Sequence, residues 1–198
     1  MASRVVITAD KVNAVIGSIT KLVGKEVLVG IPEANASRQN DDSSGPVNNA
    51  MIGYLMENGS PARNVPARPW LVPGVRDSTS QWSPHLKGAA NAALDGNTQR
   101  SDQELAASGV IAASGVKRKI NSNIPPPLSA ATIRGRKYGR DTKSRRETED
   151  RYLNMIRSPA KGGAGMSPGD AQSAAGIVAL VNTGEFRNAV DSVVRKKT

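Results

Sequence analysis

Apolar residues recur every three or four positions over residues 12–23, which predicts an amphipathic helix. Asp10 is placed to cap its first turn, and Gly24 is placed to end it. Directly afterwards apolar residues alternate with other residues over 27–31, the two-residue period of a strand, and Pro32 stops that strand. The chain is therefore predicted to begin with a helix followed by a strand.

Polar and proline-rich segments follow this opening. Residues 35–49 are mostly Asn, Ser, Asp, Gly and Gln, which predicts a long mobile loop. Helical spacing returns over 50–58, and Gly59 closes that short helix. The segment 61–73 contains four prolines, which are incompatible with a helix interior, so an extended and rigid strap is expected there.

Two helix starts are predicted in the middle of the chain. Ser83 before Pro84 is a favourable start, because proline at the first helical position wastes no amide donor. A second start is expected at Ser101, where Glu104 completes a capping box. The stretch 84–122 is thus expected to be the long helical element, and its small residues allow close packing within or between subunits.

The C-terminal third combines a basic stretch with a short ordered end. Residues 134–161 contain ten Lys or Arg against four Asp or Glu, and the chain as a whole has a net charge of +10. Gly and Ser residues over 162–169 predict a flexible joint. Thr183 is expected to cap a short helix that runs to residue 190, and 192–194 is expected to be a final strand.

Composition argues against most enzyme classes. The chain has no cysteine and a single histidine, His85, which excludes thiolate zinc sites, multi-histidine metal sites and cysteine nucleophiles. The acidic residues are scattered, and the glycines at 162–165 lack the lysine and hydroxyl of a phosphate-binding loop. We therefore expect no enzyme activity, no cofactor and no metal, with His85 exposed and inert.

The composition also bears on stability and location. Only 3% of the residues are aromatic, so the core is thin and aliphatic, and part of the stability is expected to come from neighbouring subunits. No apolar run approaches the roughly 20 residues that span a bilayer, and the first residues lack the core of a signal peptide. A soluble protein made in the cytoplasm, with no membrane contact, is the expectation.

The basic stretch has two interpretations. Lys and Arg neutralise phosphates, and Tyr138 and Tyr152 are placed to stack on bases, which would make the chain a DNA-binding accessory protein. Alternatively, the stretch is a solvated face that docks on an acidic protein partner. No recognisable nucleic-acid-binding motif accompanies the charge, so the second interpretation is preferred.

Several short motifs resemble a known family. Residues 54–59 read YLMENG and residues 65–71 read VPARPWL, and GVKRKI follows at 115–120. Near the end, residues 180–186 read LVNTGEF. In order and spacing these segments resemble the virion morphogenesis proteins of tailed bacteriophages, known as tail-completion, neck or tail-terminator proteins. The matching pieces cover about half of the chain, and the basic Gly-rich residues at about 138–176 depart from the family pattern.

The resemblance implies an architecture and a function. The fold class it implies is α+β, with a small antiparallel sheet packed on one long helix and an N-terminal helix, plus long loops and a basic insertion. One ring-forming domain would comprise residues 1–137 and 177–198, and residues 138–176 would be the insertion. The first strand, the strap and the final strand would form the sheet layer. Residues 35–49 and the insertion would become ordered on assembly.

The function implied is structural. The chain would form a homo-oligomeric ring at the head–tail junction of the virion, with identical subunits and neighbouring portal-side, connector or tail proteins as partners and a passing contact with genomic DNA. Trp70 would anchor the strap, while Arg63 and Arg68 would face a neighbouring subunit. The predicted interface residues are Glu57, Arg63, Arg68, Trp70, Arg140, Arg145, Arg146 and Arg151.

Overall fold

The opening helix and strand lie where the hydrophobic pattern places them. The computed structural model describes residues 12–38, 48–138, 143–157 and 165–197. In it, α1 (Val12–Val23) is followed by β1 (Lys25–Gly30), and the Gly24 amide donates to the Thr20 carbonyl at 3.0 Å at the end of the helix. The expected cap at Asp10 lies outside the described residues. Both predicted elements are confirmed.

The sheet consists of two strands within the described part of the chain. β2 (Asp191–Lys196) pairs with β1 in antiparallel register, with Leu28 opposite Val193. The face of the sheet that carries Val27 lies against the long helix α5 (Thr98–Asn121), where Gly109 allows the close approach. The α+β class with a small antiparallel sheet packed on helices is confirmed, and so is the final strand.

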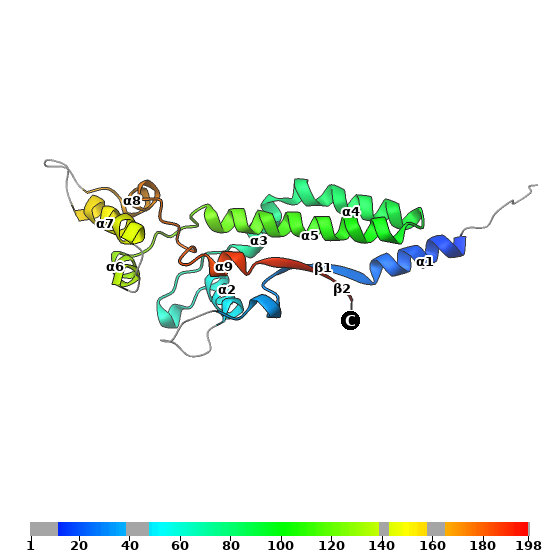
Figure 1. The fold of residues 1–198 in the computed structure, drawn as a ribbon, viewed down its shortest axis with the longest axis horizontal. Helices are drawn as coiled ribbons and strands as arrows, with labels where there is room; N and C mark the ends of the chain where they lie inside the picture. Colours follow the sequence, from blue (N-terminus) through cyan, green and yellow to red (C-terminus); the bar gives the residue numbers. More distant parts are fainter. Residues whose placement is uncertain (1–11, 39–47, 139–142, 158–164, 198) are drawn as a thin grey trace, which may run out of the picture.

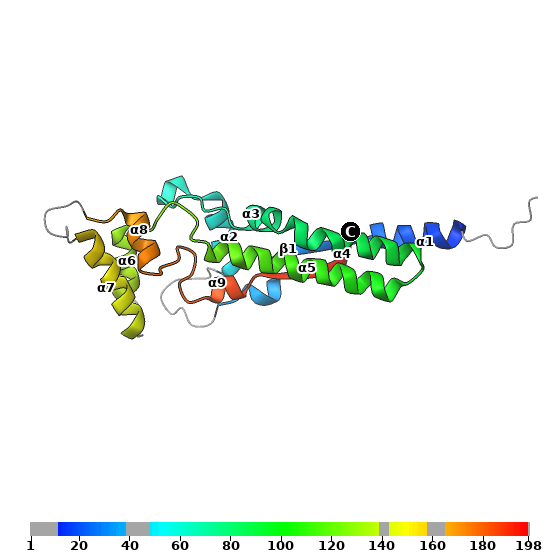
Figure 2. The ribbon, with the colours of Figure 1, turned by 90° about the horizontal axis from the view of Figure 1, so that it is seen from above.

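Two long antiparallel helices form the body of the molecule. α4 (Thr79–Leu94) and α5 (Thr98–Asn121) lie side by side along most of their lengths, as both views show (Figures 1 and 2). Their contact is made largely by small residues, which allow two helices to approach closely. The buried small residues of the two helices are Ala89, Ala92, Ala93, Ser101, Ser108, Gly109, Ala112, Ala113 and Gly115.

Both predicted helix starts in this region are wrong by a few residues. α4 begins before Ser83, so that Pro84 lies inside the helix, where packing of α4 on α5 outweighs the lost amide hydrogen bond. α5 begins at an Asn97 cap, whose side chain accepts from the Arg100 amide at 3.0 Å. Ser101 is instead buried inside α5, and no capping box forms.

The proline-rich strap is only partly extended. It contains η2 (Pro61–Arg63) and leads directly into α3 (Leu71–Asp77), with Pro73 in the first turn of that helix. The strap is not a strand of the sheet, because its prolines remove the amide donors that a ladder needs; its β contact is an isolated bridge between Ser60 and Val65. The expectation that the whole of 61–73 is extended and joins the sheet is therefore wrong.

Hydrogen bonds join the two described ends of the segment that precedes the strap. η1 (Glu33–Asn35) precedes the expected loop, and α2 (Asn49–Asn58) follows it, as predicted. Asn49 is buried, its amide donates to the Ala36 carbonyl at 2.8 Å, and its side chain donates to the Asn35 carbonyl at 3.3 Å. Residues 39–47 of the expected mobile loop lie outside the described residues.

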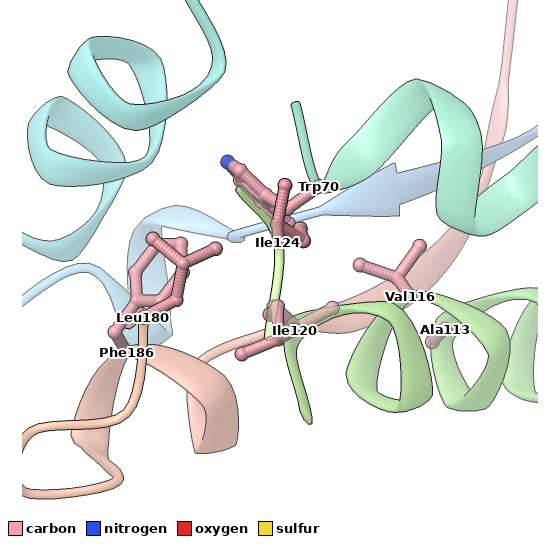
Figure 3. Close-up of a cluster of buried hydrophobic side chains, with 8 residues drawn as sticks. Trp70, Ala113, Val116, Ile120, Ile124, Leu180 and Phe186 are labelled. Carbon is pink, nitrogen blue, oxygen red and sulfur yellow. The ribbon is translucent and has the colours of Figure 1, made fainter. Parts of the chain in front are cut away.

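The main hydrophobic core lies where the body, the strap and the C-terminal segment meet (Figure 3). Trp70 from the strap stands among aliphatic residues of α5 and against Phe186 of α9 (Glu185–Asn188). The Thr183 hydroxyl accepts from the Glu185 amide at 3.3 Å, but Gly184 is the N-cap residue and α9 ends at Asn188, so the predicted cap and the predicted end at residue 190 are each wrong by one or two residues. The buried members of this core are Trp70, Ala113, Val116, Ile120, Ile124, Leu180, Phe186 and Val190.

A second, separate core lies at the far end of the molecule from α1 (Figure 1). It is built by α6 (Ala130–Tyr138), α7 (Lys143–Arg157) and α8 (Pro168–Ala174), which we call the cationic unit. Its buried residues are Leu128, Ile133, Tyr152, Leu153, Ala171, Ala175, Ile177 and Ala179. The described parts of 138–176 therefore fold on helices of their own in a single chain, against the expectation that they order only on assembly.

The packing of α3 and α4 on α5 gives a test of the small-residue contact. A methyl group added at Gly115 would lie 2.9 Å from the Gly74 carbonyl oxygen and against the Ser78 side chain. Gly115→Ala is therefore expected to lower the free energy of unfolding by about 1–3 kcal/mol in urea denaturation.

Gly135→Ala in α6 is the matched control, because nothing lies within 4 Å of the added methyl group. Alanine gives the unfolded chain less backbone entropy than glycine does. The free energy of unfolding is therefore expected to rise by about 0.5–1 kcal/mol in this variant. Equal changes in the two variants would contradict the close packing at Gly115.

Candidate interaction surfaces

Two of the motif segments that carry the family resemblance, 54–59 and 65–71, meet in one place. The Glu57 carboxylate, at the end of α2, accepts from the amides of Trp70 at 2.6 Å and Leu71 at 2.9 Å through Oε2, and from Val72 at 3.3 Å through Oε1. These amides open α3 and have no partner within the helix. The residue at the N-cap position, Trp70, makes no side-chain capping bond, so a glutamate from another helix takes that role.

Trp70 itself holds the strap to the body. Its side chain is 3% exposed, and its Nε1 donates to the Gly53 carbonyl at 3.0 Å. Its ring meets the edge of Phe186, with centroids 5.0 Å apart and an interplanar angle of 78°, a favourable arrangement for aromatic pairs. The prediction that Trp70 anchors the strap is confirmed.

Arg68 points inward, not toward a neighbouring subunit. Only 6% of the residue is exposed, and burial lowers the pKa of its guanidinium from the ordinary value. Nε and Nη2 donate to the Pro126 carbonyl at 3.0 and 2.8 Å, and Nη2 also lies 3.4 Å from the Pro127 carbonyl. The predicted outward role of Arg68 is wrong, because the turn after α5 leaves carbonyls that need a donor. Arg63, in η2, is exposed.

The predicted basic interface residues divide between the described and undescribed parts of the chain. Arg146 and Arg151 are exposed on α7 in the cationic unit. Arg140 and the side chain of Arg145 lie outside the described residues. Arg157 adds a further exposed cation at the end of α7, so the outward surface of this helix is basic but interrupted by Glu147.

The inner side of α7 carries structural residues. Tyr152 is fully buried, its hydroxyl donates to the Leu128 carbonyl at 3.2 Å, and burial raises the pKa of the phenol. The prediction that Tyr152 stacks on bases is therefore wrong, and the side chain of Tyr138 lies outside the described residues. Glu149 is 3% exposed, and its Oε2 has no hydrogen-bond partner.

A cavity of about 240 Å³ lies between the cationic unit and the main core. Arg136 lines it and donates through Nη2 to the Ala179 carbonyl, which also lines it, at 2.7 Å. Arg38 pairs with Glu185 at 3.3 Å, while its buried Nε has no hydrogen-bond partner. Met56 and Phe186 contribute apolar walls.

Two apolar surfaces lie outside the cationic unit, one on α1 and one on the sheet. α1 has no buried residue, although its composition is more apolar than that of α2, α4, α5, α6 or α7. Its outer side carries a stripe that we call the α1 stripe, with exposed fractions of 60, 54, 43 and 66% for Val12, Ile16, Ile19 and Val23.

The second apolar surface is the face of the sheet away from α5. The cross-strand pair Leu28 and Val193 lies in the middle of the ladder and is 40 and 42% exposed. The Glu26–Arg195 ion pair, at 2.7 Å, borders it on one side, and Asp191 borders it on the other. We call this surface the open sheet face.

Within the part of the chain that the structure describes, the histidine and acidic side chains form no recognisable catalytic site. His85 is not a lone exposed residue: its Nδ1 lies 2.7 Å from Oε2 of Glu104, the residue expected to complete a capping box. Among the described ranges, no three His, Cys, Asp or Glu side chains are grouped to hold a metal ion. No helix in those same ranges is long and apolar enough to cross a bilayer.

Comparison with family models, with curated proteins and with solved structures found no match to this chain. The interaction surfaces therefore have to be argued from the residues themselves. Sequence reasoning did not foresee the open sheet face, although the alternation over 27–31 put Leu28 on the side opposite Val27 and Val29. The same reasoning predicted a single apolar side for the helix over 12–23.

Proposed function

We propose that this chain is a structural virion protein of a tailed bacteriophage, which forms a homo-oligomeric ring at the head–tail junction. In this proposal the protein functions through the shape of its assembly. Identical subunits repeat one contact until the ring closes, and the ring then presents a symmetric face to the next layer. The partners in this proposal are identical subunits and neighbouring portal-side, connector or tail proteins.

The observation that carries the proposal is the unlike chemistry of the two ends of an elongated chain. α1 lies at one end, the two-stranded sheet lies near the middle, and the cationic unit lies at the other end (Figures 1 and 2). The exposed apolar surfaces are on α1 and on the sheet, and the exposed cations are on α7. Contiguous exposed apolar surface in a soluble protein marks an interaction site. A chain with two different contact surfaces associates head to tail, and such contacts generate rings when the rotation closes.

The order of the family motifs supports the same function. Glu57, from the first motif, binds the amides at the end of the second motif, and Trp70 of the second motif packs on Phe186 of the last one. The residues that carry the resemblance thus form one connected framework in this chain. Glu57, Trp70 and Phe186 act as this internal framework, while the surfaces for partners lie elsewhere.

The ring is tested by sizing and imaging the purified full-length chain. Light scattering after gel filtration and negative-stain images are expected to show one closed ring of fixed subunit number, and labelled antibody is expected to mark the head–tail junction of phage particles that contain the protein. A monomer at every concentration, or absence from mature particles, would contradict the proposal.

A DNA-binding accessory protein is the second candidate, favoured by the exposed cations of α7 at Arg146, Arg151 and Arg157. The sizing experiment separates it when duplex DNA is added across a salt series. Binding of the chain to DNA that falls steeply with salt, without ring formation, would favour this candidate.

A further inference from the structure

The α1 stripe and the side of α1 that packs against its own chain are two different sides of the helix. Val15 and Leu22 are half-buried, in keeping with the packing of α1 beside α4. The α1 stripe lies to one side of these residues, and its members are spaced by four, three and four positions. A helix that is apolar on two sides is normally buried on both. The outer side of α1 therefore lacks the cover that its composition requires.

The open sheet face lacks cover in the same way. A two-stranded sheet is marginally stable on its own and gains stability from packing on each side. α5 covers one face of this sheet near Val27 and Ser192, while the Leu28 and Val193 pair on the other face remains exposed. A helix laid across a sheet face is the ordinary way to bury such a pair.

The helix cannot cover the sheet of its own chain. Gly24 is the single residue between α1 and β1, and the Lys197 amide donates to its carbonyl at 2.8 Å, which ties this junction to the end of β2. From there α1 leads away from the sheet, beyond the end of both strands (Figures 1 and 2). The two surfaces therefore do not cover each other within one chain.

We infer that the α1 stripe of one copy packs on the open sheet face of the next copy, against Leu28 and Val193. This inference rests on the self-assembly in the proposed function and names its contact. The two surfaces match in length, since the stripe extends over roughly 16 Å of helix and a six-residue strand over roughly 20 Å. They also match in chemistry: the stripe is uncharged, and the charges of the open sheet face lie at its ends, on Glu26, Arg195 and Asp191.

The contact is heterologous, because it joins two different surfaces of identical chains. Each copy would offer one stripe and one sheet face, so every added copy leaves one of each unfilled until the ring closes. The inference therefore predicts a chain of contacts, not a two-fold dimer.

The absence of cysteine from the natural chain makes a direct test available. In Ile19→Cys/Val193→Cys, the two thiols within one chain are separated by roughly 20 Å along the helix and strand, well beyond the roughly 7 Å limit for a disulfide. Mild oxidation is expected to give a ladder of covalent dimers, trimers and higher species that collapses with reductant.

Control variants decide which surfaces meet. Ala14 lies on the opposite side of α1 from the stripe, so Ala14→Cys/Val193→Cys is expected to give no ladder. A covalent dimer from Ile19→Cys alone would show stripe-to-stripe contact and overturn the inference, and so would a dimer from Val193→Cys alone. No ladder from the double variant, in preparations that form rings, would overturn it as well.

A mixing experiment tests the direction of the contact. Ile16→Asp and Leu28→Glu are each expected to weaken self-association at least tenfold, while Ala14→Asp, with the same charge on the other side of α1, leaves it unchanged. An equimolar mixture of Ile16→Asp and Leu28→Glu is expected to form a one-to-one dimer, because one intact stripe and one intact sheet face remain. No heterodimer in that mixture, with both variants folded by circular dichroism, would overturn the inference.

The two proposals fail separately. A cysteine ladder from a protein that is absent from virions would leave the contact standing and refute the function. A ring located at the head–tail junction without the ladder would do the reverse.

Discussion

Trp70→Ala is expected to lower the free energy of unfolding by about 3–5 kcal/mol, as for other large buried aromatic residues. The indole is 3% exposed and joins the strap to α2 through the Gly53 carbonyl and to α9 through Phe186. Its removal leaves a cavity at the point where three distant segments meet (Figure 3). Phe186 is the other aromatic residue among the buried members of this core and contacts Trp70 with one ring at the edge of the other, so we expect it to fill little of that space. Urea denaturation followed by far-UV circular dichroism measures the loss.

Two further variants separate the contributions of the indole. Trp70→Phe keeps much of the apolar volume and loses the bond from Nε1 to the Gly53 carbonyl, so an intermediate loss of about 1–3 kcal/mol is expected. Trp82 is half-buried, and its Nε1 donates to the Val75 carbonyl at 3.0 Å. Trp82→Ala is expected to cost less than Trp70→Ala, and the reverse order would contradict the central place of Trp70.

Glu57→Ala is expected to lower the free energy of unfolding by about 3 kcal/mol, since hydrogen bonds to charged groups contribute roughly 1.5–3 kcal/mol each and do not add fully. The substitution removes the acceptor for the amides of Trp70, Leu71 and Val72 at the start of α3. A negative charge at that position also interacts favourably with the helix dipole. Thermal and urea unfolding of the purified chain measure the effect.

Glu57→Gln and Glu33→Ala are the matched variants. Glutamine keeps an oxygen that can accept from one or two of the amides, so its loss is expected to fall between wild type and alanine. Glu33 is an exposed acid in η1, and its removal is expected to change the free energy of unfolding by less than about 0.5 kcal/mol. A loss at Glu57 no greater than at Glu33 would show that other groups satisfy the start of α3.

Local patterns predicted the elements whose cause is local. The spacing in α1, the alternation in β1 and the final strand needed only hydrophobic period and a following glycine or proline, and all three are confirmed. The class of the fold was predicted as well. Local patterns could not predict which segment packs on each face of a helix or strand, because the packing segment lies far away in the chain.

The errors have the same origin. Helix starts were predicted from capping side chains directly before the helix. α3 is instead capped by Glu57, which lies thirteen residues before Trp70. The rule for proline places Pro84 at the start of α4, whereas packing on α5 extends that helix backwards to Thr79. In both cases tertiary contacts override a local preference.

The predicted interface shows a similar limit. Arginine in a proline-rich strap is typical of a contact residue, and Arg63 is exposed as expected. Five positions later, Arg68 is drawn inward by the Pro126 carbonyl, which no sequence pattern linked to it. The α1 stripe was visible in the sequence, but only the direction in which α1 leaves the sheet shows that its own chain cannot use it.

The bond between Arg68 and the Pro126 carbonyl has a mechanical consequence. It joins the strap to the short connection that leads from α5 to the cationic unit. If the cationic unit pivots about that connection, this guanidinium must release its carbonyl first, so the strap sets the stiffness of the joint. Load applied at one end of the molecule would therefore reach the other in part through this guanidinium.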